Sequence, residues 1–334
     1  MSIDTPESLR AHLQTAIEIE WSTIPPYLCA LWSIEDGGNQ EAATCLQDVV
    51  MEEMLHLTQA ANVLNALGGA PRLGAPGTVP DYPAALPHSD RSFQVSLLRF
   101  SQEALETFRR IEHPALIGAP PQPDRYTTIA QFYEAVSEAV ERLGADRAIW
   151  SGDPARQVVP NSQYYGGGGD AIAVTGRHSA LEALQLVIDE GEGFAGSVFD
   201  GDHEILGEAE ELAHYFRFDE LCRGRRYVRG DTPSSGPTGD PILLDYDAVA
   251  PMRANPRADD YPRGSELRAM TEECDATYAR LLARLQTAFN GAPETLADAV
   301  RDMWALKYQA VALMRVPVGD TGETAGPAFA APRR

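Results

Sequence analysis

The chain has 334 residues, 44% of them hydrophobic and 23% charged, and is long enough to bury a substantial core. Its 49 acidic and 27 basic residues give a formal net charge of −22, which excludes nucleic acid and anionic membrane surfaces as expected partners. The uncharged stretches are too short to span a membrane and the N-terminus lacks the apolar run of an export signal, so a cytoplasmic protein is expected.

The first 70 residues predict two long helices joined by a short turn. A threonine cap followed by proline begins the first helix, and its apolar residues recur every three or four positions except at Glu20. The prolines at 25 and 26 predict a kink, because proline lacks a backbone donor. Turn-forming residues at 36–39 lead into the second helix, whose apolar face is interrupted by Glu53 and His56.

The middle of the chain predicts an insertion between the second and third bundle helices, at 71–177. Residues 71–95 are rich in Pro, Gly and Ala without periodicity, which is typical of a loop. Apolar spacing predicts helices at 101–111 and 128–143. The glycine-rich run at 164–170 also predicts a loop, because no G-K-[ST] follows it as a phosphate-binding loop would require.

A second pair of helices follows the insertion. The third bundle helix is predicted from about residue 179 to 193, with an apolar stripe that continues through Glu192. The fourth is predicted over 203–222, where Glu211 and His214 share a face with apolar residues.

Two further helices are predicted near the C-terminus, at 265–288 and 293–314, separated by an Asn-Gly turn. The sequence as a whole predicts a single all-α domain. Its four-helix core comprises residues 5–70 and 178–223, and a helical extension occupies 224–334.

Each helix pair carries an E-x-x-H motif on its second helix, at 53–56 and 211–214, which places the carboxylate and the imidazole on one helix face. In four-helix carboxylate proteins two helices donate one Glu each and the other two donate E-x-x-H. Glu20 and Glu53 lie at matching heights, each about 25 Å from the first turn at 1.5 Å per residue. Glu192 and Glu211 match in the same way, at about 14 Å from the second turn.

A single E-x-x-H on a helix more often faces solvent, but the matched pairs favour one shared metal site. Glu190 fits the height nearly as well as Glu192, and we prefer Glu192 because it continues the apolar stripe. Four carboxylates and two imidazoles suit two iron ions, with manganese as the alternative, and two cations offset the buried negative charge. The predicted ligands are Glu20, Glu53, His56, Glu192, Glu211 and His214.

Aromatic and basic residues flank these positions. Trp21, Tyr27 and Tyr215 are candidates for lining a substrate pocket, and Arg217 for holding a substrate carboxylate through its planar guanidinium. The alternative for most of them is core packing.

The chain resembles the ferritin-like proteins related to the iminophenyl-pyruvate dimer synthase of violacein-type biosynthesis. The resemblance covers most of the chain and is carried by residues 16–20, 22–27, 52–56, 62–69, 191–193 and 214–218. It implies a ferritin-like bundle, favours the same six metal-ligand positions, and suggests an amino-acid-derived substrate.

The leading hypothesis is therefore a diiron oxidoreductase of specialised metabolism, with a small-molecule substrate and dioxygen as partners. One alternative is an imine-coupling enzyme, as the resemblance implies. Another is a non-catalytic metal-binding or iron-storage protein, because a fold does not determine an activity. The oligomeric state is open, with a homodimer as one option.

Overall fold

The structure is a computed structural model that describes residues 2–75, 77–159, 170–192, 197–199 and 211–330, with only the backbone of residue 192. The described residues form α-helices, short 3₁₀ turns and loops, and pair as strands only in isolated β-bridges. The all-α fold class is thereby confirmed.

The first two helices, α1 (Pro6–Ser33) and α2 (Gln40–Ala66), form an antiparallel pair in the middle of the molecule. The Thr5 hydroxyl accepts a hydrogen bond of 3.1 Å from the backbone N–H of Ser8, which is the predicted N-cap. The helix α1 continues through its two internal prolines and ends only at Ser33, as the sequence predicted.

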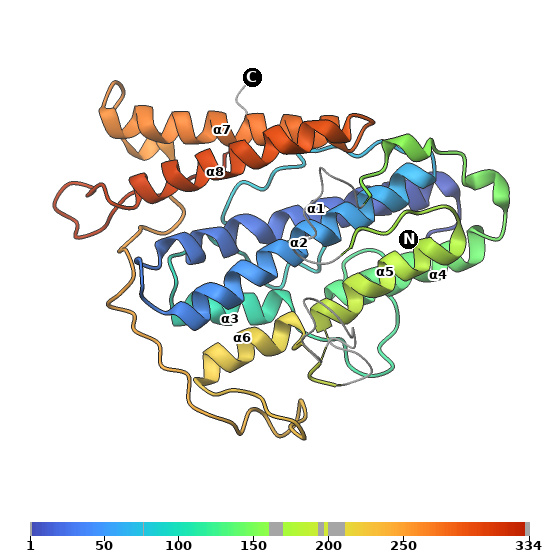
Figure 1. Cartoon of the computed structure of the whole chain (residues 1–334), viewed down its shortest axis with the longest axis horizontal. Helices are drawn as coiled ribbons and strands as arrows, with labels where there is room; N and C mark the ends of the chain where they lie inside the picture. The colour runs from blue at the N-terminus through green and yellow to red at the C-terminus, as the bar shows by residue number, and fades with distance from the viewer. Residues whose placement is uncertain (1, 76, 160–169, 193–196, 200–210, 331–334) are drawn as a thin grey trace.

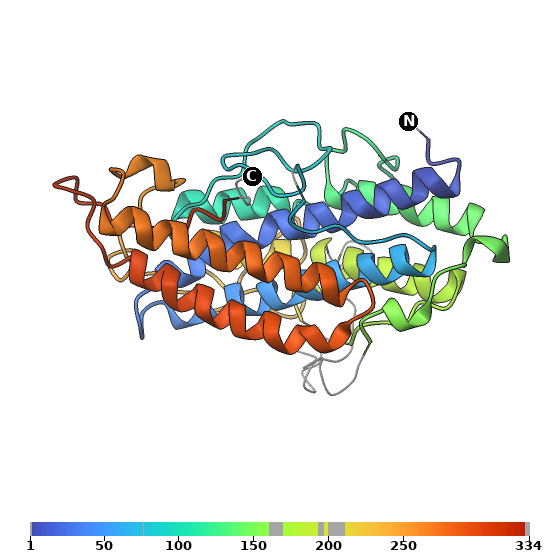
Figure 2. The same cartoon turned by 90° about the horizontal axis from the view of Figure 1, so that it is seen from above.

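Four shorter helices complete the bundle, and they are α3 (Gln102–Ile111), α4 (Ile129–Leu143), α5 (Arg177–Glu192) and α6 (His214–Arg223). The helix α4 packs against α5, and α3 packs against α6. Figures 1 and 2 show α3 and α6 towards one end of the bundle and α4 and α5 towards the other. The predicted helices at 101–111 and 128–143 are confirmed, and both are built into the bundle.

The fourth bundle helix begins later than predicted. Residues 203–210 lie outside the described residues, and residues 211–213 are not helical. Leu212 forms an antiparallel bridge with Phe199, and the Ala213 N–H donates to the Val198 carbonyl at 3.2 Å. Inside a helix the Ala213 N–H would bond to the carbonyl four residues earlier, but here it is used by Val198, and α6 begins at His214.

The two predicted C-terminal helices are confirmed as α7 (Glu266–Ala288) and α8 (Leu296–Leu313), which pack against each other as a hairpin. In Figure 1 the α1–α2 pair lies between this hairpin and the α5 and α6 helices. No helix within the described ranges combines the length and apolarity needed to cross a bilayer. The predicted loop at 164–170 lies, except for Asp170, outside the described residues.

Candidate metal centre

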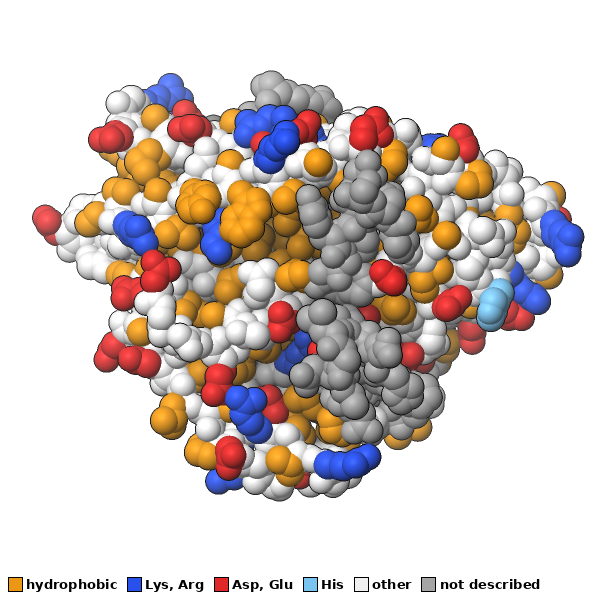
Figure 3. Space-filling view, viewed as in Figure 1, with side chains coloured by type: hydrophobic (Ala, Val, Ile, Leu, Met, Phe, Trp, Pro, Cys, Tyr) orange, Lys and Arg blue, Asp and Glu red, His pale blue; other side chains and the backbone are white. Residues whose placement is uncertain are grey.

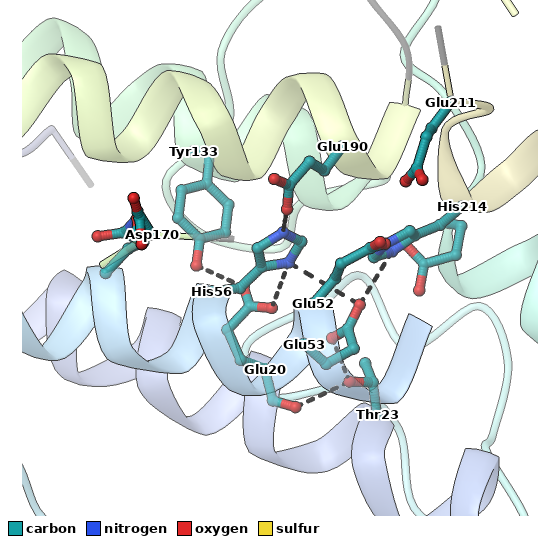
Figure 4. A network of polar contacts seen from close by, with 12 residues as sticks. Glu20, Thr23, Glu52, Glu53, His56, Tyr133, Asp170, Glu190, Glu211 and His214 are labelled. Carbon is teal, nitrogen blue, oxygen red and sulfur yellow. Dashed lines mark hydrogen bonds and ion pairs between the residues drawn. The ribbon is translucent and has the colours of Figure 1, made fainter. Parts of the chain in front are cut away.

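Two triplets of ligand groups meet inside the bundle. Glu20 of α1 and Glu53 and His56 of α2 form the first triplet, and Glu53, Glu112 and His214 form the second, with the ligand atoms of each triplet within 4.8 Å of one another. All five side chains are buried. Glu53 belongs to both triplets and therefore lies where a carboxylate could bridge two ions (Figure 4).

The Nδ1 atoms of the two histidines face the same carboxylate oxygen. Oε1 of Glu53 lies 3.9 Å from Nδ1 of His56 and 3.1 Å from Nδ1 of His214. Glu20 approaches Nδ1 of His56 to 3.6 Å, and Glu112 approaches Nδ1 of His214 to 3.7 Å. The imidazole rings stack with their centroids 5.4 Å apart. Two ring nitrogens and three carboxylate oxygens, five atoms in all, thus face one another inside the bundle.

Hydroxyl groups fix the other oxygen of each carboxylate. Tyr133 donates to Oε1 of Glu20, Thr23 donates to Oε2 of Glu53 at 2.6 Å, and Tyr27 donates to Oε1 of Glu112. In each case the oxygen that faces the histidines is the one the hydroxyl leaves available. This arrangement orients three carboxylates towards a common centre before any cation binds.

Two further carboxylates hold the outer nitrogens of the histidines. Nε2 of His56 lies 2.5 Å from Oε2 of Glu190, and Nε2 of His214 lies 2.7 Å from Oε2 of Glu52. Metal-binding histidines usually make such a contact through the ring nitrogen that does not bind the metal. Arg217 in turn contacts Glu52 at 3.0 Å. Burial would raise the pKa of Glu52, but Arg217 and His214 lower it to about 2.

The cluster carries more buried negative charge than its described basic neighbours offset. Burial raises the pKa of Glu112 and Glu190. Burial alone would lower the pKa of His56, but its contacts with Glu190 and Glu20 raise it to about 10. The metal-free cluster is therefore expected to retain protons on its histidines, and divalent cations would displace them.

The donor set fits two divalent transition-metal ions. Carboxylate oxygens and imidazole nitrogens are ligands that iron and manganese accept. Two buried atoms of the cluster, Oε1 of Glu190 and Nδ1 of His214, make no hydrogen bond within the part of the chain that the structure describes. Nδ1 of His214 instead has ion-pair contacts with Glu53 and Glu112, the two other members of its triplet, so a cation bound there would face all three groups.

A small cavity adjoins the first triplet. It has a volume of about 20 Å³ and lies against Glu20, His56, Tyr133, Val187 and Gly191, between α4 and α5. A cavity needs roughly 10–15 Å³ to hold one water molecule. The space beside the cluster therefore suits a ligand the size of water or dioxygen.

Four of the six predicted ligands, Glu20, Glu53, His56 and His214, are brought together by the structure. The side chain of Glu192 lies outside the described residues, whereas Glu190, the alternative, contacts His56. Glu211 belongs to neither triplet and pairs with Arg217 at 3.0 Å. The reason is local, because residues 211–213 precede α6 and the i,i+3 geometry of a helical E-x-x-H does not apply.

Glu112 was missed by the sequence reasoning. It is the C-cap residue of α3, in the segment interpreted as an insertion. A signal was present, since Glu112 continues the apolar stripe of Leu105 and Phe108 at helical spacing, as Glu20 does on the first helix.

The four residues predicted to bind substrate do not share one cavity. Tyr27 is buried against Glu112, and the ring of Tyr215 packs edge-on to His113. Trp21 donates to the Tyr278 hydroxyl at 2.7 Å and faces away from the metal cluster. Arg217 lines an open hollow of about 420 Å³, but its guanidinium contacts Glu52 and Glu211.

Comparisons with known proteins agree with the fold. The family model described as "Ferritin-like" matches residues 13–223. The 2-imino-3-(indol-3-yl)propanoate dimerase of Chromobacterium violaceum is 25% identical over 99% of this chain and 34% of its own length. The dichlorochromopyrrolate synthase of Lentzea aerocolonigenes is 25% identical over 88% of this chain and 30% of its own length. The chain thus spans about a third of these relatives.

A solved structure shares the fold. The crystal structure of a ferritin-like protein from Caulobacter vibrioides superposes with a TM-score of 0.67 at 22% identity, covering 99% of this chain and 100% of that one. At this identity the likeness supports the fold alone.

Proposed function

The chain belongs to the ferritin-like family, and from that premise we propose that it is a dinuclear non-haem metalloenzyme that oxidises a small molecule with dioxygen. Two iron ions are the proposed cofactor, with manganese as the alternative. The observation that carries the proposal is Glu53, which stands in both buried triplets of ligand groups. A bridging carboxylate between two carboxylate–histidine sets is the arrangement that a metal pair requires.

Five residues of the chain would bind the two ions. Glu20 and His56 would bind one ion, Glu112 and His214 the other, and Glu53 both. The bound ions would supply the redox chemistry with dioxygen. Glu190 and Glu52 accept the outer ring protons of the histidines and so leave both Nδ1 atoms free of protons when cations bind. The small cavity beside Glu20 leaves space at one ion for a small ligand.

The relatives support a role in specialised metabolism. Both are biosynthetic enzymes by name, a dimerase of an indole imine and a chromopyrrolate synthase. We therefore propose a small, amino-acid-derived substrate. The same names favour a second function, coupling of imine intermediates, in which the bundle would bind the substrate without consuming dioxygen.

Metal content and oxygen dependence test the proposal together. The protein is reconstituted with ferrous iron under anaerobic conditions, desalted, and analysed for metal by mass spectrometry. We expect about two ions per chain, and a change in the visible absorption spectrum when oxygen is admitted. Absence of bound metal after reconstitution with either iron or manganese would overturn the metalloenzyme assignment.

A substrate assay separates the two functions. The imine of indole-pyruvate is supplied to the iron-loaded protein with and without oxygen, and the products are analysed by mass spectrometry alongside oxygen uptake. If the protein oxidises the substrate, oxygen uptake should rise in proportion to the amount of product formed. Equal yields of a coupled product in the absence of oxygen would move the assignment to imine coupling.

A further inference from the structure

A third cavity lies on the other side of the α1–α2 pair, away from the candidate metal centre. It is a groove of about 560 Å³ between these helices and the α7–α8 hairpin (Figure 3). Successive residues of a helix point about 100° apart. Trp21 and Met54 therefore face the groove, whereas their neighbours Glu20 and Glu53 face the metal centre.

The groove is lined by apolar and aromatic side chains. Figure 3 shows hydrophobic side chains gathered between the α7–α8 hairpin and the rest of the molecule. Among the described residues that line the groove, none is acidic. Its aromatic lining residues are Trp21, Trp32, Tyr278, Phe289, Trp304 and Phe329. The volume falls within the roughly 300–1,000 Å³ of small-molecule sites, so the dimensions suit a small aromatic ligand.

The one cation of this lining is the only lysine of the chain. Lys307 is half-buried, lines the groove and lies 5.6 Å from the ring centroid of Trp304. In the ranges that the structure describes it makes no ion pair, although the protein has a net charge of −22. An ammonium group without an acidic partner beside an apolar cavity favours a ligand with one negative charge.

A buried hydroxyl adds a second polar group. Tyr278 lines the groove with only 1% of its surface exposed. Its hydroxyl accepts a hydrogen bond from Trp21 at 2.7 Å and donates to no atom of the described residues. Its proton is thus available to a ligand, and a few polar groups in an otherwise apolar lining are typical of a binding site.

We propose that this groove is a binding site for a small aromatic monoanion, whose ring system packs between α1–α2 and α7–α8 and whose charged group pairs with Lys307. The site is separate from the metal centre, because the α1–α2 pair lies between them. The inference does not depend on the oxidase function, and each can fail without the other.

Two fluorescent probes of matched ring structure test the charge preference. One is 1-anilinonaphthalene-8-sulfonate, an aromatic monoanion, and the other is N-phenyl-1-naphthylamine, which lacks the sulfonate. We expect the folded protein to bind one anionic probe per chain, and about tenfold more tightly than the neutral probe, because a charge-assisted contact is gained. Equal affinities for the two probes would contradict the proposed anion preference.

Three variants locate the site. Lys307→Gln should lower the affinity for the anionic probe about tenfold and leave the affinity for the neutral probe unchanged. Arg301→Gln is the matched control, since it removes one positive charge from α8 at an exposed position outside the groove, and it should change neither affinity. Val300→Trp fills the groove and should abolish binding of both probes.

The outcomes that would overturn the proposal are specific. If Lys307→Gln binds the anionic probe as tightly as the parent protein, Lys307 does not pair with the ligand. If Val300→Trp still binds both probes, they occupy another surface. Metal content is measured on the same variants and should be unchanged, which separates a failure here from a failure of the metal centre.

Discussion

Three single substitutions distinguish the ligand set proposed from the two triplets from the one predicted by the E-x-x-H motifs. Glu53 stands in both triplets, Glu112 in one and Glu211 in neither. Removing the charge at each position should therefore leave different numbers of ions. We expect about two ions per chain in the parent protein and in Glu211→Gln, about one in Glu112→Gln, and close to none in Glu53→Gln.

The assay is metal analysis after dialysis against a competing chelator, with circular dichroism to show that each variant remains helical. Glutamine keeps the shape of the side chain, so packing around the cluster changes little. The buried hydroxyls of Thr23 and Tyr27, which donate to Glu53 and Glu112, keep an acceptor in the glutamine variants, because the amide oxygen still accepts a hydrogen bond. If Glu211→Gln lost an ion while Glu112→Gln kept two, the motif-based ligand set would be correct and the structure-based one refuted.

Three further predictions concern the groups around the ligands. Arg217→Met removes the basic partner of buried Glu52 and should cost about 3–5 kcal/mol in the unfolding free energy of the metal-free protein at pH 7, measured with urea; a loss below about 1 kcal/mol would contradict it. Tyr133→Phe removes the hydroxyl that fixes Glu20 and should weaken metal affinity roughly 10–100-fold in a chelator competition, without loss of helicity. Burial raises the pKa of Glu220 to about 7. The protonated carboxyl therefore contributes fully to the stability of the fold below about pH 4.5, and this contribution is lost as pH rises through 7. Glu220→Gln should match the parent near pH 4 and exceed its stability by roughly 1 kcal/mol at pH 8, because solvent partly screens the charge of this half-buried carboxylate. The same stability difference at both pH values would refute the assignment.

Most helices could be predicted from the sequence because their signals are local. A cap at Thr5, apolar spacing along α1 and α2, and turn residues between them define elements without reference to the rest of the chain. The start of α6 could not be predicted in this way. The residues before it pair with Val198 and Phe199. The apolar spacing of residues 203–222 does not indicate that pairing.

The centre could be predicted in part for the same reason. Glu20, Glu53 and His56 lie on continuous helices, where spacing alone determines which side chains share a face. Glu112 follows the last turn of a short helix, and its place in the cluster depends on how α3 packs against α6. Packing of this kind is a tertiary property, so matching heights along the helices led to Glu211, which the structure pairs with Arg217 and includes in neither triplet.

The ends of three helices, α3, α5 and α6, explain why so many polar groups meet at one point. A continuous helix presents side chains to a given spot only at spacings of three or four residues, so each contributes one or two ligands. Here α3 ends one residue before Glu112, α6 begins at His214, and Glu190 lies near the end of α5. The ends of these helices therefore add Glu112, His214 and Glu190 to the ligand groups that the sides of α1 and α2 supply. A bundle of four unbroken helices would place an E-x-x-H motif on the fourth helix. In this structure the carboxylate that contacts Nε2 of His214 comes from Glu52 of α2 instead.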